Sequence, residues 1–191
     1  MIVKYKLALL KNFLVSQLVI LSDAHIDQLS KKCNSYLFLL SRISVLSRRN
    51  RIPFYNIYIL PHLDFCCISW GNCSSTLEDK LVKFQKRVAQ VTLYCDFYTL
   101  SSELFKELNW QTFPERVTYQ KAILMYRTIT NICPDYLKQT MSHILLTYQD
   151  TRSTNCNQLY TPKHNCKLFR KSFMYSGAAI WNSLPLKMQL R

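Results

Sequence analysis

The clearest pattern in the sequence lies between residues 77 and 92, where apolar residues recur at alternating steps of four and three. This spacing is typical of one face of an α-helix. The apolar face is formed by Leu77, Leu81, Phe84, Val88 and Val91. The other face carries polar and basic residues, namely Lys80, Lys83, Lys86, Arg87 and Gln90. Ser75 and Glu78 fit a capping box at the helix start. We therefore predict an amphipathic helix with a basic, solvent-facing side.

The chain before this helix is predicted in four parts. Residues 1–21 form a poorly defined apolar lead-in, which Lys11 and several polar residues interrupt, so a signal peptide or membrane span is not favoured. From Asp23, a predicted N-cap, to Ile43 the apolar spacing predicts a helix. The basic sequence SRRNR at 47–51 is predicted to be a loop. Residues 52–70 are apolar on nearly all sides, which predicts a buried helical segment.

Pro61 is expected to kink or divide this buried segment, because proline lacks the backbone N–H that a helix interior needs. His62 and Asp64 stand next to it. We interpret both as partners for backbone groups that the proline frees, with a proton relay as the alternative.

The chain after residue 92 is also predicted to be helical. A short helix is expected at 102–108, and Thr112 with Glu115 forms a second capping box that opens a long helix. The apolar line of this long helix is predicted at Val117, Leu124 and Ile129. The helix should end at Cys133-Pro134, followed by a short helix towards Ile144 and, near the C-terminus, by Trp181 as an apolar anchor.

Composition agrees with a helical fold. The chain has 191 residues, of which 49% are hydrophobic, and only two are glycine, which disfavours hairpin-rich β folds and glycine-rich phosphate loops. We expect a mainly α protein, an irregular multi-helix bundle with a short, partly extended basic C-terminal segment. The expected domains are a lead-in at 1–21, a helical domain at 22–146, and a linker with a basic and aromatic segment at 147–191.

The formal net charge of +14 changes the functional picture. Positive charge gathered on one side of a protein attracts polyanions, chiefly nucleic acid or an anionic membrane. Residues 157–173 mix cations with aromatic rings, a combination that can follow a phosphate backbone and stack on bases. The predicted nucleic-acid contacts are Lys80, Lys83, Lys86, Arg87, Arg152, Lys163, Lys167, Arg170 and Lys171.

The eight cysteines contain no C-x-x-C pair, and most lie in apolar helical patterns, where a reduced thiol packs as a small hydrophobic group. Cys156, His164 and Cys166 could supply three metal ligands, but a fourth at zinc-site spacing is missing. We therefore expect no metal, no cofactor and a reducing compartment, either nuclear or cytoplasmic.

The sequence contains none of the common catalytic motifs. It has no nucleophile elbow, no H-E-x-x-H and no deaminase zinc signature. Its eleven acidic residues include one neighbouring pair, Glu78-Asp79, whereas a two-metal polymerase or nuclease site needs clustered carboxylates. We expect that this chain is not an enzyme and has no small-molecule substrate.

Four stretches nevertheless resemble a known family when they are taken in order. They are FYNIYILPHLDFCCISWGN (54–72), LVKFQKRVAQV (81–91), LFKELNWQTFPERVTYQKAILMYRTITNICPDYL (104–137), and the C-terminal TRST, NQLYTPK and FRKSFMYSGAAIWNSLP pieces. The chain resembles the C-terminal region of a LINE-type, jockey-like non-LTR retrotransposon reverse transcriptase, the part that follows the catalytic palm.

The resemblance implies a thumb-like, non-catalytic region of an RNA-directed DNA polymerase that binds RNA or an RNA–DNA duplex. The polymerase carboxylates would belong to a palm domain that is missing here and that would be the second partner. Two alternatives remain open: an inactive remnant whose helices only dock on such a palm, and a basic helical protein that binds anionic membranes.

Overall fold

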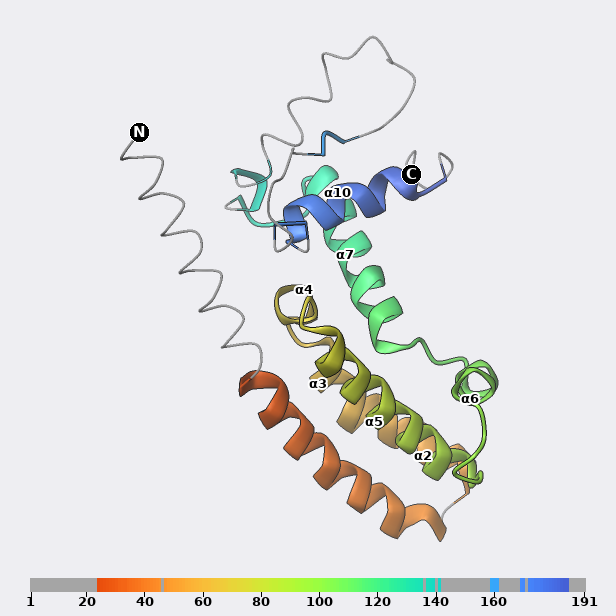
Figure 1. Ribbon diagram of the computed structural model, residues 1–191. Helices are drawn as coiled ribbons and strands as arrows, with labels where there is room; N and C mark the ends of the chain where they lie inside the picture. Colours follow the sequence, from red (N-terminus) through yellow and green to blue (C-terminus); the bar gives the residue numbers. More distant parts are fainter. Residues whose placement is uncertain are drawn as a thin grey trace. The chain divides into compact units, whose positions relative to one another are not determined.

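The computed structural model describes residues 24–45, 47–135, 137–139, 141, 159–161, 169–170 and 172–185. Within these ranges the chain is mainly helical and contains no strand, which confirms the predicted fold class (Figure 1). The chain folds as two compact units, Met1–Arg116 and Val117–Arg191, which we describe separately. The lead-in at 1–21 and the predicted domain boundary at 146–147 lie outside the described residues.

The first unit begins with the predicted helix, which the structure shows at residues 24–42, continued by the short 3-10 helix η1 (Ile43–Val45). Its buried side chains are Ile26, Leu29, Cys33 and Leu40. In Figure 1 this helix is red to orange and runs in the same direction as α5 (Ser75–Leu93). The two helices line a common hollow, so they are neighbours in space.

The prediction of a loop at 47–51 is wrong. Ser47 is extended, and α2 (Arg48–Phe54) starts directly after it. Arg51 explains the earlier start, because its side chain is buried, donates from Nη1 to the Val91 carbonyl at 3.1 Å and lies 4.9 Å from the centre of the Tyr94 ring. These contacts hold the second turn of α2 against the end of α5.

The segment after α2 is helical but divided. A π-helical stretch, η2 (Tyr55–Ile59), leads into α3 (Leu60–Asp64), and α4 (Cys67–Trp70) follows after a break. Pro61 lies near the start of α3, and the widened turns before it suit a residue that cannot donate a helical hydrogen bond. The break itself falls at Cys66, which is left-handed with φ of 51°.

The prediction that 52–70 is buried on all sides is also wrong. Tyr55, Ile59 and Leu63 are in the core, whereas Ile57 and Phe65 are exposed. The buried positions repeat every four residues, so this segment has one protein-facing side like any surface helix.

The predicted helix 77–92 is present as α5, but its start differs from the prediction. The N-cap is Ser74, one residue before the expected Ser75, and the described contacts include no side-chain hydrogen bond to the free N–H groups at this end. The Ser74 hydroxyl instead lies 2.9 Å from the Thr76 hydroxyl. The apolar face is confirmed at Leu77, Leu81, Phe84 and Val88.

Two further helices complete the chain up to residue 129. α6 (Ser101–Leu108) confirms the short predicted helix, and α7 (Phe113–Ile129) begins where the second capping box was expected. The Glu115 carboxylate accepts from the Thr112 N–H at 2.8 Å, which is one of the two bonds of that box.

In the second unit, the buried face of α7 differs from the predicted line. Its fully buried side chains are Val117, Lys121, Met125 and Thr128, while Leu124 and Ile129 are only partly buried. Residues 135, 137–139 and 141 are helical, in agreement with the short helix predicted there.

The core of the second unit forms around α10 (Phe173–Ser183). Trp181 is buried as predicted and packs with a set of apolar side chains, Met125, Met141, Leu159 and Ala178. Asn182 binds both backbone groups of Leu159, accepting from its N–H at 2.7 Å and donating to its carbonyl at 2.8 Å. Gly177 allows close packing, since a Cβ there would lie 2.7 Å from the Met125 methyl carbon.

Candidate nucleic-acid interface

The basic face of α5 is the first candidate site. Lys80, Lys83 and Arg87 are exposed, and Lys86 is half-buried beside them. The steps of three and four from Lys80 to Arg87 place these three side chains on one side of the helix. At 1.5 Å per residue they extend over about 10 Å along the axis. We call these four side chains the α5 ridge.

No member of the α5 ridge forms an ion pair with any residue that the structure describes. The ion pairs in the described ranges join Arg48 to Glu107 at 2.6 Å, Arg116 to Asp64 at 2.5 Å and Lys138 to Asp135 at 3.4 Å. Glu78 and Asp79 stand in the first turns of α5, where carboxylates interact favourably with the helix dipole. The charge of the ridge is therefore available to an external anion.

A hollow of about 500 Å³ lies at the end of the ridge, between residues 34–41 and the C-terminal half of α5. Its lining includes Arg87 from the ridge, Asn34 and Phe38 from the first helix, and Val91, Cys95 and Phe97. A second hollow of about 350 Å³ shares Val91 and Cys95 and extends to Tyr94 and Asp96. Together we call these two hollows the groove.

The loop after α5 is fixed by Gln90. Its side-chain Nε2 donates to the Phe97 carbonyl at 2.9 Å and to the Asp96 carbonyl at 3.5 Å. The Thr99 N–H closes a turn on the Asp96 carbonyl at 3.2 Å. The prediction that Gln90 belongs to the exposed basic face is therefore wrong, because a buried amide is needed to satisfy these loop carbonyls.

The C-terminal unit carries most of the excess positive charge. Residues 117–191 contain ten Lys and Arg against two Asp and Glu, so this unit holds +8 of the net +14. Among the predicted contacts here, Arg170 is helical and exposed. Arg152, Lys163, Lys167 and Lys171 lie outside the described residues. The structure therefore brings Lys80, Lys83, Lys86 and Arg87 together, and Arg170 is described on the other unit.

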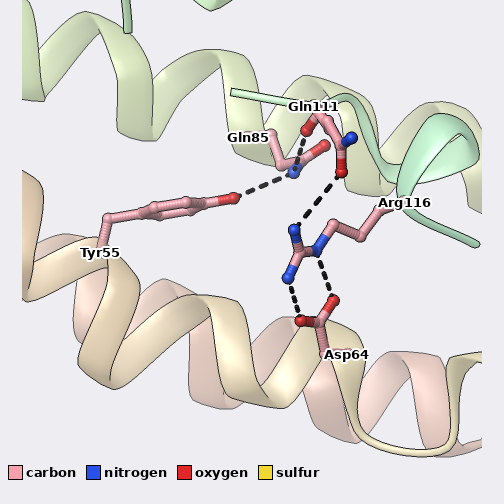
Figure 2. A network of polar contacts seen from close by, with 5 residues as sticks. All are labelled: Tyr55, Asp64, Gln85, Gln111 and Arg116. Carbon is pink, nitrogen blue, oxygen red and sulfur yellow. Dashed lines mark hydrogen bonds and ion pairs between the residues drawn. The ribbon is translucent and has the colours of Figure 1, made fainter. Parts of the chain in front are cut away.

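The sequence suggested that Asp64 binds backbone groups near Pro61, and this interpretation is wrong. Asp64 accepts two hydrogen bonds from Arg116, whose Nη1 also donates to the Gln111 side chain at 3.4 Å (Figure 2). Gln85 continues this network, donating to the Tyr55 hydroxyl at 3.1 Å and accepting from the Phe113 N–H at 2.8 Å. Burial raises the pKa of Tyr55 to about 12.

The interpretation of His62 as a backbone partner is likewise wrong. Its ring stacks on Tyr36 with centroids 5.5 Å apart, and its Nε2 lies 3.4 Å from the Tyr36 hydroxyl. His62 and Asp64 therefore contact different partners, the first on helix 24–42 and the second on α7. Each of the two contacts joins α3 to another helix, which gives both side chains a packing role.

No disulfide joins any of the described cysteines, which are Cys33, Cys66, Cys67, Cys73, Cys95 and Cys133. Burial raises the pKa of Cys33 to about 11, so this thiol stays protonated at neutral pH. The described ranges bring together no group of three side chains suited to a metal ion. Cys156, His164 and Cys166 lie outside them. Within the same ranges, no helix has the length and apolar character that crossing a bilayer requires.

The aromatic lining of the groove was not predicted from the sequence. Phe38 belongs to a helix whose apolar spacing indicated only core contacts, and Phe97 follows a helix end. The available signal was the pair Phe38 and Leu39, two large apolar residues on the otherwise polar side of helix 24–42.

No protein-family model, curated protein or solved structure matches this chain significantly, so the resemblance to non-LTR reverse transcriptases remains a prediction.

Proposed function

We propose that this chain is a non-catalytic nucleic-acid-binding region that holds RNA or an RNA–DNA duplex on basic helix faces. The observation that supports this most is the α5 ridge, where four cations lie together and none is paired with a described acidic residue. What distinguishes these four cations is their spacing, because they lie within eight consecutive residues of one helix.

In this proposal the ridge binds phosphates and sets the position of the nucleic acid on the protein. Lys and Arg contacts to phosphate carry no base information, so the binding is insensitive to sequence. Each phosphate neutralised releases counterions, which makes affinity fall as salt rises. The predicted C-terminal cations add further contacts in this proposal, namely Arg152, Lys163, Lys167, Arg170 and Lys171.

In this proposal the region follows a catalytic palm, as the resemblance of its sequence to a non-LTR retrotransposon reverse transcriptase implies. The proposed second partner is therefore a palm domain. This chain would bind the RNA template next to that domain. The polymerase chemistry belongs to that domain in this proposal.

A filter-binding titration of the full chain against RNA and an RNA–DNA duplex across salt concentrations tests the proposal. If about five phosphates are contacted, log affinity falls against log salt with a slope of roughly −3.5 to −4.5. An affinity that is absent, or that does not change with salt, contradicts it.

A second candidate function is docking alone, and the exposed apolar residues of the segment 54–70 favour it. Ile57 and Tyr58 are exposed on η2 and Phe65 is exposed just after α3, and together they would form an interface with a palm domain. This candidate predicts that the isolated chain self-associates and becomes monomeric with its partner. A monodisperse monomer in light scattering contradicts it.

A further inference from the structure

The groove at the end of the α5 ridge has a different chemistry from the ridge itself. Two phenylalanine rings line it, Phe38 with 58% and Phe97 with 73% of its surface exposed. Tyr98, next to Phe97, is 91% exposed. Rings this open to water contribute little to the core, and exposed aromatic surface is typical of binding sites.

Cations flank these rings. The Arg42 guanidinium lies 4.9 Å from the centre of the Phe38 ring, and Arg87 lines the same hollow as Phe38 and Phe97. Arg87 is also the last member of the ridge. A strand that follows the ridge along its phosphates therefore arrives at the aromatic lining.

The loop backbone that carries Phe97 is held in place before any ligand binds. The buried Gln90 amide fixes the carbonyls of Asp96 and Phe97, and the Phe97 and Tyr98 rings meet edge to face with centroids 5.9 Å apart. Because the loop is already ordered, stacking a ligand on it requires little further loss of conformational freedom.

The smaller hollow of about 350 Å³, which adjoins the hollow lined by the two rings, includes the groove's one acidic residue, Asp96. A carboxylate repels phosphate but accepts hydrogen bonds from the exocyclic amino group of a base. The hollow of about 500 Å³ is within the range of pockets that bind small organic groups. The groove thus combines aromatic faces, flanking cations and an acceptor, all of which suit a nucleobase.

We propose that the groove binds an unpaired base of a single strand, which stacks on its aromatic lining while the neighbouring phosphates contact Arg87 and Lys83. This inference rests on the proposed function, because the strand must first be held by the ridge. The additional contact is with the exposed face of a base, which is covered by its neighbours in a duplex.

The test uses the full chain and three fluorescent ligands of equal length: a single strand, the same strand with abasic residues at its centre, and a duplex. Fluorescence anisotropy should show the single strand binding roughly tenfold tighter than the abasic strand, the size of effect expected from stacking one base. The double variant Phe38→Ala/Phe97→Ala should remove this difference while abasic-strand and duplex affinities stay unchanged. Both rings are largely exposed, so the fold should tolerate their loss.

Phe65→Ala is the matched control, since Phe65 is 68% exposed in the same unit but lines neither hollow. It should leave the preference intact. Equal wild-type affinity for the two single strands, or a preference that survives the double variant, overturns the inference. So does binding to vesicles of anionic lipid that depends on Phe97 while no base preference is seen.

The same three ligands distinguish a failure of the proposed function from a failure of this inference. Lys83→Gln/Arg87→Gln should weaken binding of all three ligands, because it removes phosphate contacts. If wild-type protein binds none of them, the proposed function fails and this inference fails with it. If it binds all of them without a base preference, the inference alone fails.

Discussion

Arg116 holds Asp64 with two parallel hydrogen bonds, Nε to Oδ1 at 2.8 Å and Nη2 to Oδ2 at 2.5 Å (Figure 2). The pair joins the last residue of α3 to the first turn of α7, 52 residues later. Both side chains are about three-quarters buried, so solvent screens them only partly. The pair fixes the start of α7 on the first unit.

Arg116→Lys is expected to lower the free energy of unfolding by about 1–3 kcal/mol, because an ammonium group cannot replace a two-pronged guanidinium contact. Urea denaturation of the full chain measures this. Arg127→Lys on the exposed face of α7 is the control and should change stability by less than about 0.5 kcal/mol. Equal effects of the two substitutions would contradict a structural role for the pair.

Gln85→Leu should lower the free energy of unfolding although leucine and glutamine are similar in size. Gln85 is buried and holds the Tyr55 hydroxyl and the Phe113 N–H, and both would lose their partner. A buried polar group without a partner costs about 1–3 kcal/mol, so we expect a loss of at least that size. Thermal unfolding followed by circular dichroism measures the loss. A variant as stable as wild type would show that water or another group satisfies this site.

Stability should fall at alkaline pH through Cys33 and Tyr55. Burial raises the pKa of Cys33 from 9.0 to about 11 and that of Tyr55 from 10.0 to about 12. The folded state therefore retains protons that the unfolded state releases, so the contribution is full below pH 9 and is lost as pH rises towards 12. Each group contributes about 2–3 kcal/mol at most.

Urea titrations between pH 7 and 11 measure this dependence. Cys33→Ala should flatten the decline that begins above pH 9, and Tyr55→Phe should flatten the part above pH 10. Should both variants lose stability with pH as steeply as wild type, other groups must cause the decline.

Asn109→Gly should stabilise the first unit. Asn109 follows α6 in the left-handed conformation, with φ of 53°, and the Trp110 N–H returns to the Phe105 carbonyl at 2.9 Å. Glycine adopts this conformation without a Cβ penalty, so we expect a gain of roughly 0.5–1 kcal/mol, and Asn109→Ala should lose about 1 kcal/mol. Chemical denaturation of both variants gives the comparison, and an alanine variant as stable as the glycine variant would contradict it.

Local periodicity predicted most of the helices but not their surroundings. Leu77, Leu81, Phe84 and Val88 share a buried face as their spacing indicates. The polar contacts of Asp64 and Arg116 could not be predicted from local sequence patterns. The two residues are 52 positions apart and pair only because α3 and α7 pack together. The start of α2 differs from the prediction for a similar reason. Arg51 is buried against Val91 and Tyr94, so the basic residues predicted to form a loop are helical instead.

One part of the candidate site, the α5 ridge, could be predicted from the sequence, whereas the groove could not. The α5 ridge follows from helical spacing alone, because steps of three and four fix which side chains share a side. The groove depends on how helix 24–42 packs beside α5 and on the Gln90 contacts to the loop at 96–97, neither of which is a local pattern.

The most direct test of a phosphate-binding ridge compares salt dependence between wild type and the variant in which Lys80, Lys83, Lys86 and Arg87 are all replaced by Gln. The four side chains are exposed or half-buried, so the variant should fold, which circular dichroism can check. If each cation meets one phosphate, the slope of log affinity for single-stranded RNA against log salt should become shallower by roughly 3, at ~0.7 per contact. A folded variant with the wild-type slope would show that the ridge does not hold the nucleic acid.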